Sequence, residues 1–183
     1  PTITGTLSAC IGNTSALTGS ATAAAVNPWV SATPAVATVS STGVVTGVSA
    51  GTSVITYTNS NGCQITATFT VNPLPVVVAD DISVCIGGTI ALTASGATTY
   101  SWAPATYLSA TTGASVNFTA GATSTYTVTG TTAFGCTSTD PITVSVLPSA
   151  PINAGPDITV CAGTTTPITA SGGVTYVWSP ATY

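Results

Sequence analysis

The stretch STGVVTGVSAGTSVITYTNSNG, residues 41–62, alternates apolar and polar side chains between glycine and asparagine turns. Half-buried antiparallel strands show this alternation, because successive side chains point to opposite faces of a sheet. In TYTVTGT, residues 125–131, Tyr126 and Val128 likewise fall on one face and the threonines on the other. No window combines a helical apolar stripe with capping residues. The sequence therefore predicts an all-β fold.

Charged side chains are almost absent, since the 183 residues include four aspartates and no lysine, arginine, glutamate or histidine. Disordered chains combine low hydrophobicity with high net charge, whereas this chain is 44% hydrophobic. Its most apolar run, 76–79, is far shorter than the roughly 20 residues of a membrane span. This short run predicts no membrane insertion, and without cationic side chains we expect no binding to nucleic acid and no attraction to anionic lipid.

A long repeat organises the chain. ADDISVCIGGTIALTASGATTYSWAPATY (79–107) lies over GPDITVCAGTTTPITASGGVTYVWSPATY (155–183) without a gap, at a shift of 76 residues (183 − 107). A looser copy, LSACIGNTSALTGS (7–20), resembles ISVCIGGTIALTAS (82–95). A period near 75 residues indicates small β-domains in tandem.

Proline clusters mark the expected domain boundaries at VNPLP (71–75) and VLPSAP (146–151). Such short, proline-stiffened linkers favour a semi-rigid string of domains. We therefore expect three units, at 1–73, 74–148 and 149–183, the third being the N-terminal half of a repeat that breaks off.

The five cysteines fit this division. Cys10 and Cys63 lie 53 residues apart (63 − 10) in the first unit, and Cys85 and Cys136 lie 51 apart (136 − 85) in the second. We predict the disulfides Cys10–Cys63 and Cys85–Cys136, and a partner for Cys161 outside the chain. Zinc binding and unpaired core cysteines are the alternatives, but zinc sites prefer closely spaced cysteine or histidine ligands. A bridge closing about 50 residues stabilises by on the order of 4 kcal/mol and indicates an extracellular location.

Residues 29–57, WVSATPAVATVSSTGVVTGVSAGTSVITY, resemble the bacterial Ig-like group 2 (BIG2) domain. The motifs that carry this resemblance are Trp29, ATV (37–39), GVVTG (43–47) and GTSVIT (51–56).

The second and third units resemble the PKD-like or SprB-like Ig modules of very large Bacteroidetes surface proteins. The matching segments are AGPDITVC (154–161), YVWSPATY (176–183), STYTVTG (124–130), GC (135–136) and a final strand at 141–146. Together the resemblances imply tandem Ig-like β-sandwiches, arranged as beads on a string. They also imply a gliding-motility adhesin or another type IX-secreted surface protein.

Each unit contains one tryptophan: Trp29, Trp102 and Trp178. As the largest side chain of its unit, each is expected in the core between two sheets. An aromatic platform for a sugar is the alternative.

Catalysis is not expected, because a serine nucleophile would have no histidine or lysine base. Asp80 and Asp81 are adjacent, so in a strand they point to opposite faces and cannot form a carboxylate pair. Asp80, Asp81 and Asp157 are weak calcium candidates, since calcium takes six to eight oxygen ligands. Turn-forming or strand-initiating aspartates are the alternative, and no cofactor is expected. A threonine-rich ice-binding face is disfavoured by the long repeat.

These observations predict a structural or adhesive repeat segment of a large secreted cell-surface filament or adhesin. Its expected partners are neighbouring repeats, laterally packed copies of itself, and an unknown surface or glycan ligand. The alternative is a discrete filament subunit, in which strands donated by a neighbouring chain complete the third unit.

Overall fold

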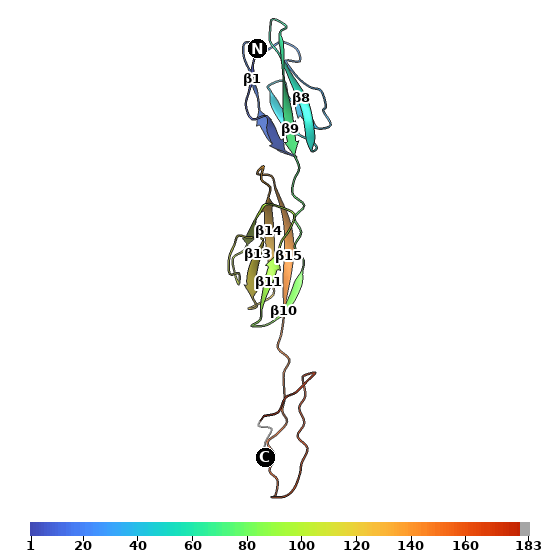
Figure 1. Cartoon of the computed structure of the whole chain (residues 1–183), viewed down its shortest axis with the longest axis vertical. Helices are drawn as coiled ribbons and strands as arrows, with labels where there is room; N and C mark the ends of the chain where they lie inside the picture. Colours follow the sequence, from blue (N-terminus) through green and yellow to red (C-terminus); the bar gives the residue numbers. More distant parts are fainter. Residues whose placement is uncertain (180–183) are drawn as a thin grey trace.

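The computed structural model describes residues 1–179, which contain β-strands, turns and loops and no helix (Figure 1). Two β-sandwiches follow one another along the long axis of the molecule, and an irregular segment follows the second. The predicted all-β fold of tandem Ig-like sandwiches is confirmed. The last four residues of the predicted third unit, 180–183, lie outside the described residues.

The first sandwich contains β1 to β9. Its four-stranded sheet has the order β2 (Ser8–Cys10), β9 (Gln64–Asn72), β8 (Gly51–Thr58) and β5 (Trp29–Ser31). Its three-stranded sheet has the order β3 (Thr14–Ala16), β7 (Val44–Gly47) and β6 (Ala37–Val39). The short pair β1 (Ile3–Thr4) and β4 (Thr18–Gly19) flanks them.

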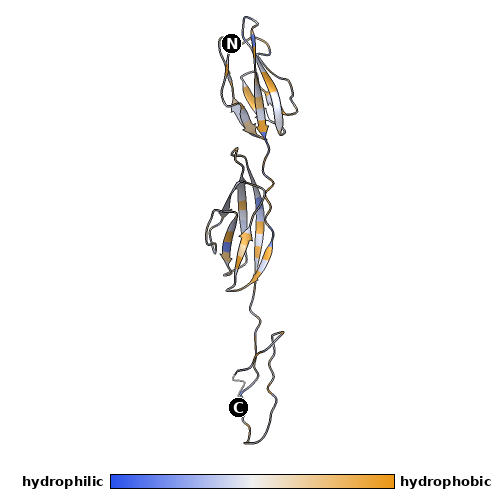
Figure 2. Ribbon diagram, in the orientation of Figure 1, coloured by the Kyte–Doolittle hydropathy of each residue, from blue (hydrophilic) through white to orange (hydrophobic). Residues whose placement is uncertain are grey.

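Alternation along β8 produces the core of the first sandwich. Ile55 is fully buried and Tyr57 nearly so, while the alternate residues Val54, Thr56 and Thr58 remain partly or fully exposed. The Tyr57 ring packs against Trp29, with 4.6 Å between ring centroids. Figure 2 shows the consequence, since hydrophobic positions alternate with polar ones along the strands of both sandwiches.

The second sandwich contains β10 to β15. Its four-stranded sheet has the order β10 (Ile82–Cys85), β15 (Thr137–Leu147), β14 (Ser124–Thr131) and β12 (Thr99–Ala103). The facing sheet pairs β11 (Thr89–Thr93) with β13 (Ser115–Thr119).

Aromatic side chains fill the second core. Trp102 is 2% exposed and its indole N–H donates a hydrogen bond to the Gly113 carbonyl at 2.9 Å. Tyr126 packs edge-on against Phe118, and its hydroxyl donates to the Thr106 carbonyl at 2.6 Å. Burial raises the pKa of Tyr126, because the phenolate would be poorly solvated there.

Both sandwiches pair a short early strand in parallel with their last strand. β2 runs beside β9 with Cys10 opposite Asn72, and β10 runs beside β15 with Cys85 opposite Leu147. The paired strands therefore finish together at the end of each sandwich that is farther from the chain's N-terminus.

The segment after residue 148 forms no strand within the described residues. Its only regular pairing there is an isolated bridge between Asn153 and Ser171. Trp178, predicted to be a core residue, is 44% exposed, so that prediction is wrong for the described structure. The reason is that Trp102, its counterpart, packs in a core built from the side chains of two facing sheets, whereas residues 149–179 form no strands that could build such a core.

Trp102→Ala should lower the free energy of unfolding of the second sandwich by about 3–5 kcal/mol, because it removes a buried indole and leaves a cavity. Urea unfolding followed by circular dichroism measures this change. Ser101→Ala, on the exposed face of the same strand, is the matched control and should change stability by less than about 0.5 kcal/mol. Equal losses from both variants would place Trp102 outside the stabilising core.

Candidate functional site: a covalent joint between the sandwiches

A disulfide joins the two sandwiches. Cys10 of the first is bonded to Cys136 of the second, with 5.5 Å between their Cα atoms and a sequence separation of 126 residues. Cys10 is 7% exposed and Cys136 1% exposed. The predicted pairings Cys10–Cys63 and Cys85–Cys136 are therefore wrong: the bridge lies between units rather than within them.

The parallel pairing of β2 with β9, and of β10 with β15, explains why the disulfide does not form within one sandwich. Cys10 ends β2 beside the end of β9, whereas Cys63 immediately precedes the start of β9. Nine residues of strand separate those two positions, about 30 Å at 3.3 Å per residue. A disulfide requires Cα atoms within about 7 Å, so the two cysteines of one sandwich cannot meet. The same holds for Cys85 and Cys136 at the two ends of β15.

A tight turn between β14 and β15 presents Cys136 to the first sandwich (Figure 1). The Cys136 N–H donates to the Thr132 hydroxyl at 3.1 Å, and the Thr132 N–H donates to the Cys136 carbonyl at 2.9 Å. Gly135 takes φ +78° in this turn, a backbone conformation that glycine adopts without strain. The Cys136 sulfur lies 4.0 Å from the carbonyl oxygen of Asn72, the last residue of β9.

The Cys10 side of the joint is equally fixed. The Asn13 N–H donates to the Cys10 carbonyl at 3.0 Å, which closes a turn directly after β2. Ile11 donates to the Asn72 carbonyl at 3.1 Å, and Gly12 donates to the Gly47 carbonyl at 2.9 Å. Cys10 is therefore held against both sheets of the first sandwich.

The polypeptide linker, residues 73–81, is the second connection between the sandwiches. Pro75 is buried and Val77 belongs to the second core. Val78 and Ser95 exchange backbone hydrogen bonds of 3.2 and 3.0 Å. Next to Ser95, Gly96 has φ +93°, and a Cβ atom there would collide with the Val76 carbonyl. The linker is therefore docked onto the second sandwich rather than hanging free.

Two aspartates anchor the end of this linker. The Ala79 N–H donates to the Asp140 carboxylate at 2.9 Å, and the Thr143 N–H donates to the Asp81 carboxylate at 2.7 Å. Among residues 1–179 no group of three or more His, Cys, Asp or Glu side chains comes together. The calcium candidates Asp80, Asp81 and Asp157 are thus not gathered into one site.

Three cysteines are unpaired within the described residues. Cys63, Cys85 and Cys161 all have exposed positions. None of them belongs to a group of three or more His, Cys, Asp or Glu side chains within residues 1–179. In the part of the chain that the structure describes, no helix is long and apolar enough to span a membrane.

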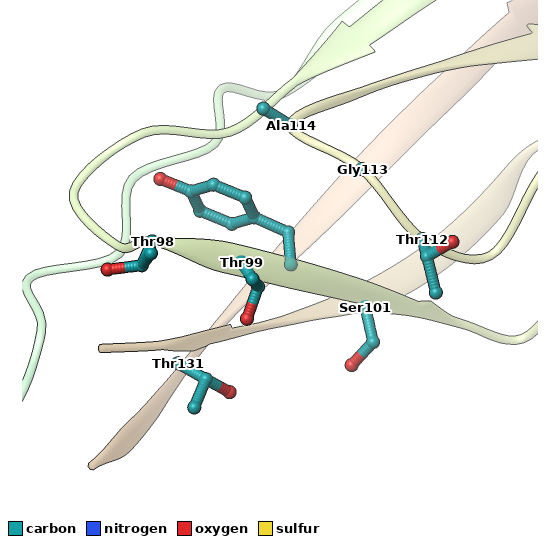
Figure 3. Close-up of a pocket in the computed structure, with 8 residues that line it drawn as sticks. Thr98, Thr99, Ser101, Thr112, Gly113, Ala114 and Thr131 are labelled. Atoms are coloured by element: carbon teal, nitrogen blue, oxygen red, sulfur yellow. The ribbon is translucent and has the colours of Figure 1, made fainter. Parts of the chain in front are cut away.

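A groove with a volume of about 500 Å³ lies beside β12, the edge strand of the second sandwich (Figure 3). Six of its eight lining residues carry a hydroxyl group, and none is charged. The lining consists of Thr98, Thr99, Tyr100, Ser101, Thr112, Gly113, Ala114 and Thr131. No pattern in the sequence indicated this groove, because loop residues 112–114 form its far wall.

The chain matches no protein-family model and no curated protein sequence. Solved structures with similar folds include domains 4 and 5 of the S-layer protein SbsC, at 18% identity and a TM-score of 0.35, covering 73% of this chain and 82% of that one. Fibronectin(III)-like modules of Clostridium thermocellum CbhA match at 10% identity and a TM-score of 0.36, covering 80% of this chain and 95% of that one. The two Ig domains of DIP-gamma match at 11% identity and a TM-score of 0.39, covering 80% of this chain and 98% of that one.

Titration of the oxidised, monomeric protein in denaturant without reductant should find three thiols, because one bridge leaves Cys63, Cys85 and Cys161 free. A non-reducing peptic digest should contain the Cys10 and Cys136 peptides linked together. Pepsin suits this experiment, because trypsin has no lysine or arginine to cleave. A single titratable thiol, with Cys10 linked to Cys63, would contradict the bridge between the sandwiches and support disulfides within each unit.

Asp140→Ala should lower the free energy of unfolding of the second sandwich by about 1–3 kcal/mol, because the Ala79 N–H loses a charged acceptor. Urea unfolding measures this, and Asp157→Ala, an exposed aspartate in the irregular segment, is the control. Added calcium should leave the unfolding midpoint unchanged. A midpoint that calcium raises in the natural protein, but not in Asp81→Ala, would instead identify a calcium site at the linker.

Proposed function

We propose that this chain is a structural and adhesive repeat segment of a large secreted cell-surface filament or adhesin, in which it acts as a rigid spacer. The Cys10–Cys136 disulfide carries this proposal, because it adds a second covalent connection between consecutive sandwiches. The bridge also supports an extracellular location, since disulfides persist in oxidising compartments.

Two connections restrict bending and swivelling of the joint more than one does. A single flexible linker lets two domains rotate about many backbone torsions, and domains joined that way usually move relative to each other. Here the linker is docked along the second sandwich through Val78 and Ala79, while the tip of the same sandwich is bonded to Cys10. Proline at positions 73 and 75 further restricts the backbone.

The disulfide also determines how tension passes through the molecule. Force applied at the two termini reaches Cys10 along β2, crosses the disulfide, and leaves along β15 from Cys136. Residues 11–135, which form most of both sandwiches, lie inside the loop that the disulfide closes. They are shielded from tension, so this part of the spacer keeps its length for as long as the disulfide is intact.

The surface suits exposure outside the cell. Lysine and arginine are absent, so trypsin-like proteases have no cleavage site. The low charge gives little repulsion between copies, which supports lateral packing of neighbouring stalks through hydroxyl and apolar contacts. We assign residues 1–73 to a BIG2-like sandwich, 74–148 to a PKD- or SprB-like sandwich, and 149–183 to the start of another.

A subunit that polymerises by strand donation is the second candidate. Val174 and Val177 are almost fully exposed, and Trp178 is 44% exposed. Strands from a neighbouring molecule could cover these side chains, as the facing sheet of β11 and β13 covers Trp102 in the second core. This candidate and the spacer differ in whether the covering strands come from another chain or from the same one.

Pulling the oxidised protein by its termini should give no extension from residues 11–135. A variant with Cys10→Ser and Cys136→Ser should extend further, because the loop is then open. The separation of 126 residues corresponds to about 440 Å of extended chain at roughly 3.5 Å per residue. Single-molecule force spectroscopy measures this difference directly.

The matched control is Cys63→Ser with Cys85→Ser, which also removes two thiols but keeps the bridge. It should behave like the natural protein. If the natural protein extends as far as the Cys10→Ser, Cys136→Ser variant, the disulfide does not bear load and the spacer function fails.

A further inference from the structure

Cys63 occupies the same kind of turn as Cys136. The Asn59 N–H donates to the Cys63 carbonyl at 3.0 Å, as Thr132 does to Cys136 at 2.9 Å. The Cys63 N–H donates to the Asn59 side-chain oxygen at 3.0 Å, as Cys136 does to the Thr132 hydroxyl at 3.1 Å. Gly62 and Gly135, the residues before the two cysteines, both have φ +78°. We call these two positions upper cysteines.

Cys10, Cys85 and Cys161 share a different turn. Their carbonyl oxygens accept hydrogen bonds from the N–H groups three residues later, at 3.0, 2.9 and 3.1 Å respectively. The second residue after each cysteine is a glycine with φ between +78° and +83°: Gly12, Gly87 and Gly163. We call these three positions lower cysteines.

The lower cysteines of the two sandwiches also sit at the same place in the sheet. Ile11, after Cys10, donates to the carbonyl of Asn72, the last residue of β9, at 3.1 Å. Ile86, after Cys85, donates to the carbonyl of Leu147, the last residue of β15, at 2.8 Å. Cys85 is therefore presented at the far end of the second sandwich as Cys10 is at the end of the first.

The connection that follows the second sandwich begins like the linker before it. Asn153 and Ser171 exchange backbone hydrogen bonds of 3.0 and 2.8 Å, as Val78 and Ser95 do. The Tyr176 hydroxyl accepts from the Gly173 N–H at 2.6 Å and donates to its carbonyl at 2.7 Å. Tyr100 closes the turn at Ala97 in the same way. Residues 149–179 thus repeat the docked linker and turns that precede a bonded upper cysteine in the second sandwich.

We propose that Cys85 forms a second joint of the same kind, with the upper cysteine of an Ig-like sandwich that continues from residues 149–179. By the same rule, Cys63 receives the lower cysteine of an Ig-like sandwich packed at the opposite end. The bonded pair found among residues 1–179 joins a lower cysteine to the upper cysteine of the next sandwich, and both remaining half-sites in the sandwiches are exposed. The inference deepens the proposed spacer function, on which it rests.

The chemistry of the new joint is an ordinary thiol oxidation. The Cys85 thiol and the partner thiol each lose a proton, one S–S bond forms, and two electrons pass to a disulfide oxidant, which becomes two thiols. Oxidised glutathione or a thiol–disulfide oxidoreductase belongs to this class of oxidant. Because Cys85 is exposed, the oxidant can reach it.

The test extends the full chain. Tyr183 corresponds to Tyr107 in the repeat, so residues 108–147 appended after Tyr183 complete a third unit with a copy of Cys136. After refolding in a glutathione redox buffer, titratable thiols should fall from three to two, although the chain has gained a cysteine. Peptic digestion should yield Cys85 linked to the added cysteine, because low pH prevents thiolate exchange.

The same extension carrying Cys85→Ser is the control, and it should leave the added cysteine free. A bond between the added cysteine and Cys161 would overturn the inference, and so would a Cys85 that stays free. If the extension does not fold, residues 1–147 followed directly by a second copy of 73–147 provide the same pair of half-sites.

The Cys10–Cys136 peptides in the same digests separate the two proposals. If that pair is linked while Cys85 stays free, the repeated joint is wrong and the spacer function stands. If Cys10 and Cys136 are themselves unlinked, the spacer function fails as well.

Discussion

In both sandwiches a short early strand, β2 or β10, pairs in parallel with the last strand, and the joint depends on that pairing. It fixes Cys10 at one end of the first sandwich and Cys63 at the other, a full strand length apart. The cysteines of one unit therefore cannot bond to each other, whereas Cys10 and Cys136 of neighbouring units do. Because these two strands run parallel, the disulfide connects two units instead of bridging two cysteines of one unit.

The nearly uncharged composition limits the kinds of interaction that can hold the two sandwiches together. The chain has no cationic side chain, so side-chain ion pairs cannot hold the sandwiches together or orient them. The structure uses hydrogen bonds from backbone N–H groups to Asp81 and Asp140, a docked linker, and one covalent bond. None of the linker contacts depends on pairing with a lysine or arginine, and salt weakens mainly the interactions between exposed charges.

Local patterns predicted much of the fold, and long-range geometry accounts for the rest. Alternation around Ile55 and Tyr57 predicted strands, and Trp29 and Trp102 lie in the two cores. The predicted cysteine pairing was wrong because spacing along the chain does not reveal that β2 and β10 run parallel to the last strand of their sandwiches. Trp178 failed because burial depends on strands that cover a residue, not on its own repeat motif. The groove beside β12 was missed because residues distant in sequence form its two walls.

The sequence separation of the joint has a consequence for the order of assembly. In a chain exported N-terminus first, Cys10 emerges long before Cys136, which follows it by 126 residues. The first sandwich must therefore complete its fold while its own end of the bridge is still a thiol. The bond closes only when the hairpin that carries Cys136 has formed, so this joint is locked after both sandwiches have folded.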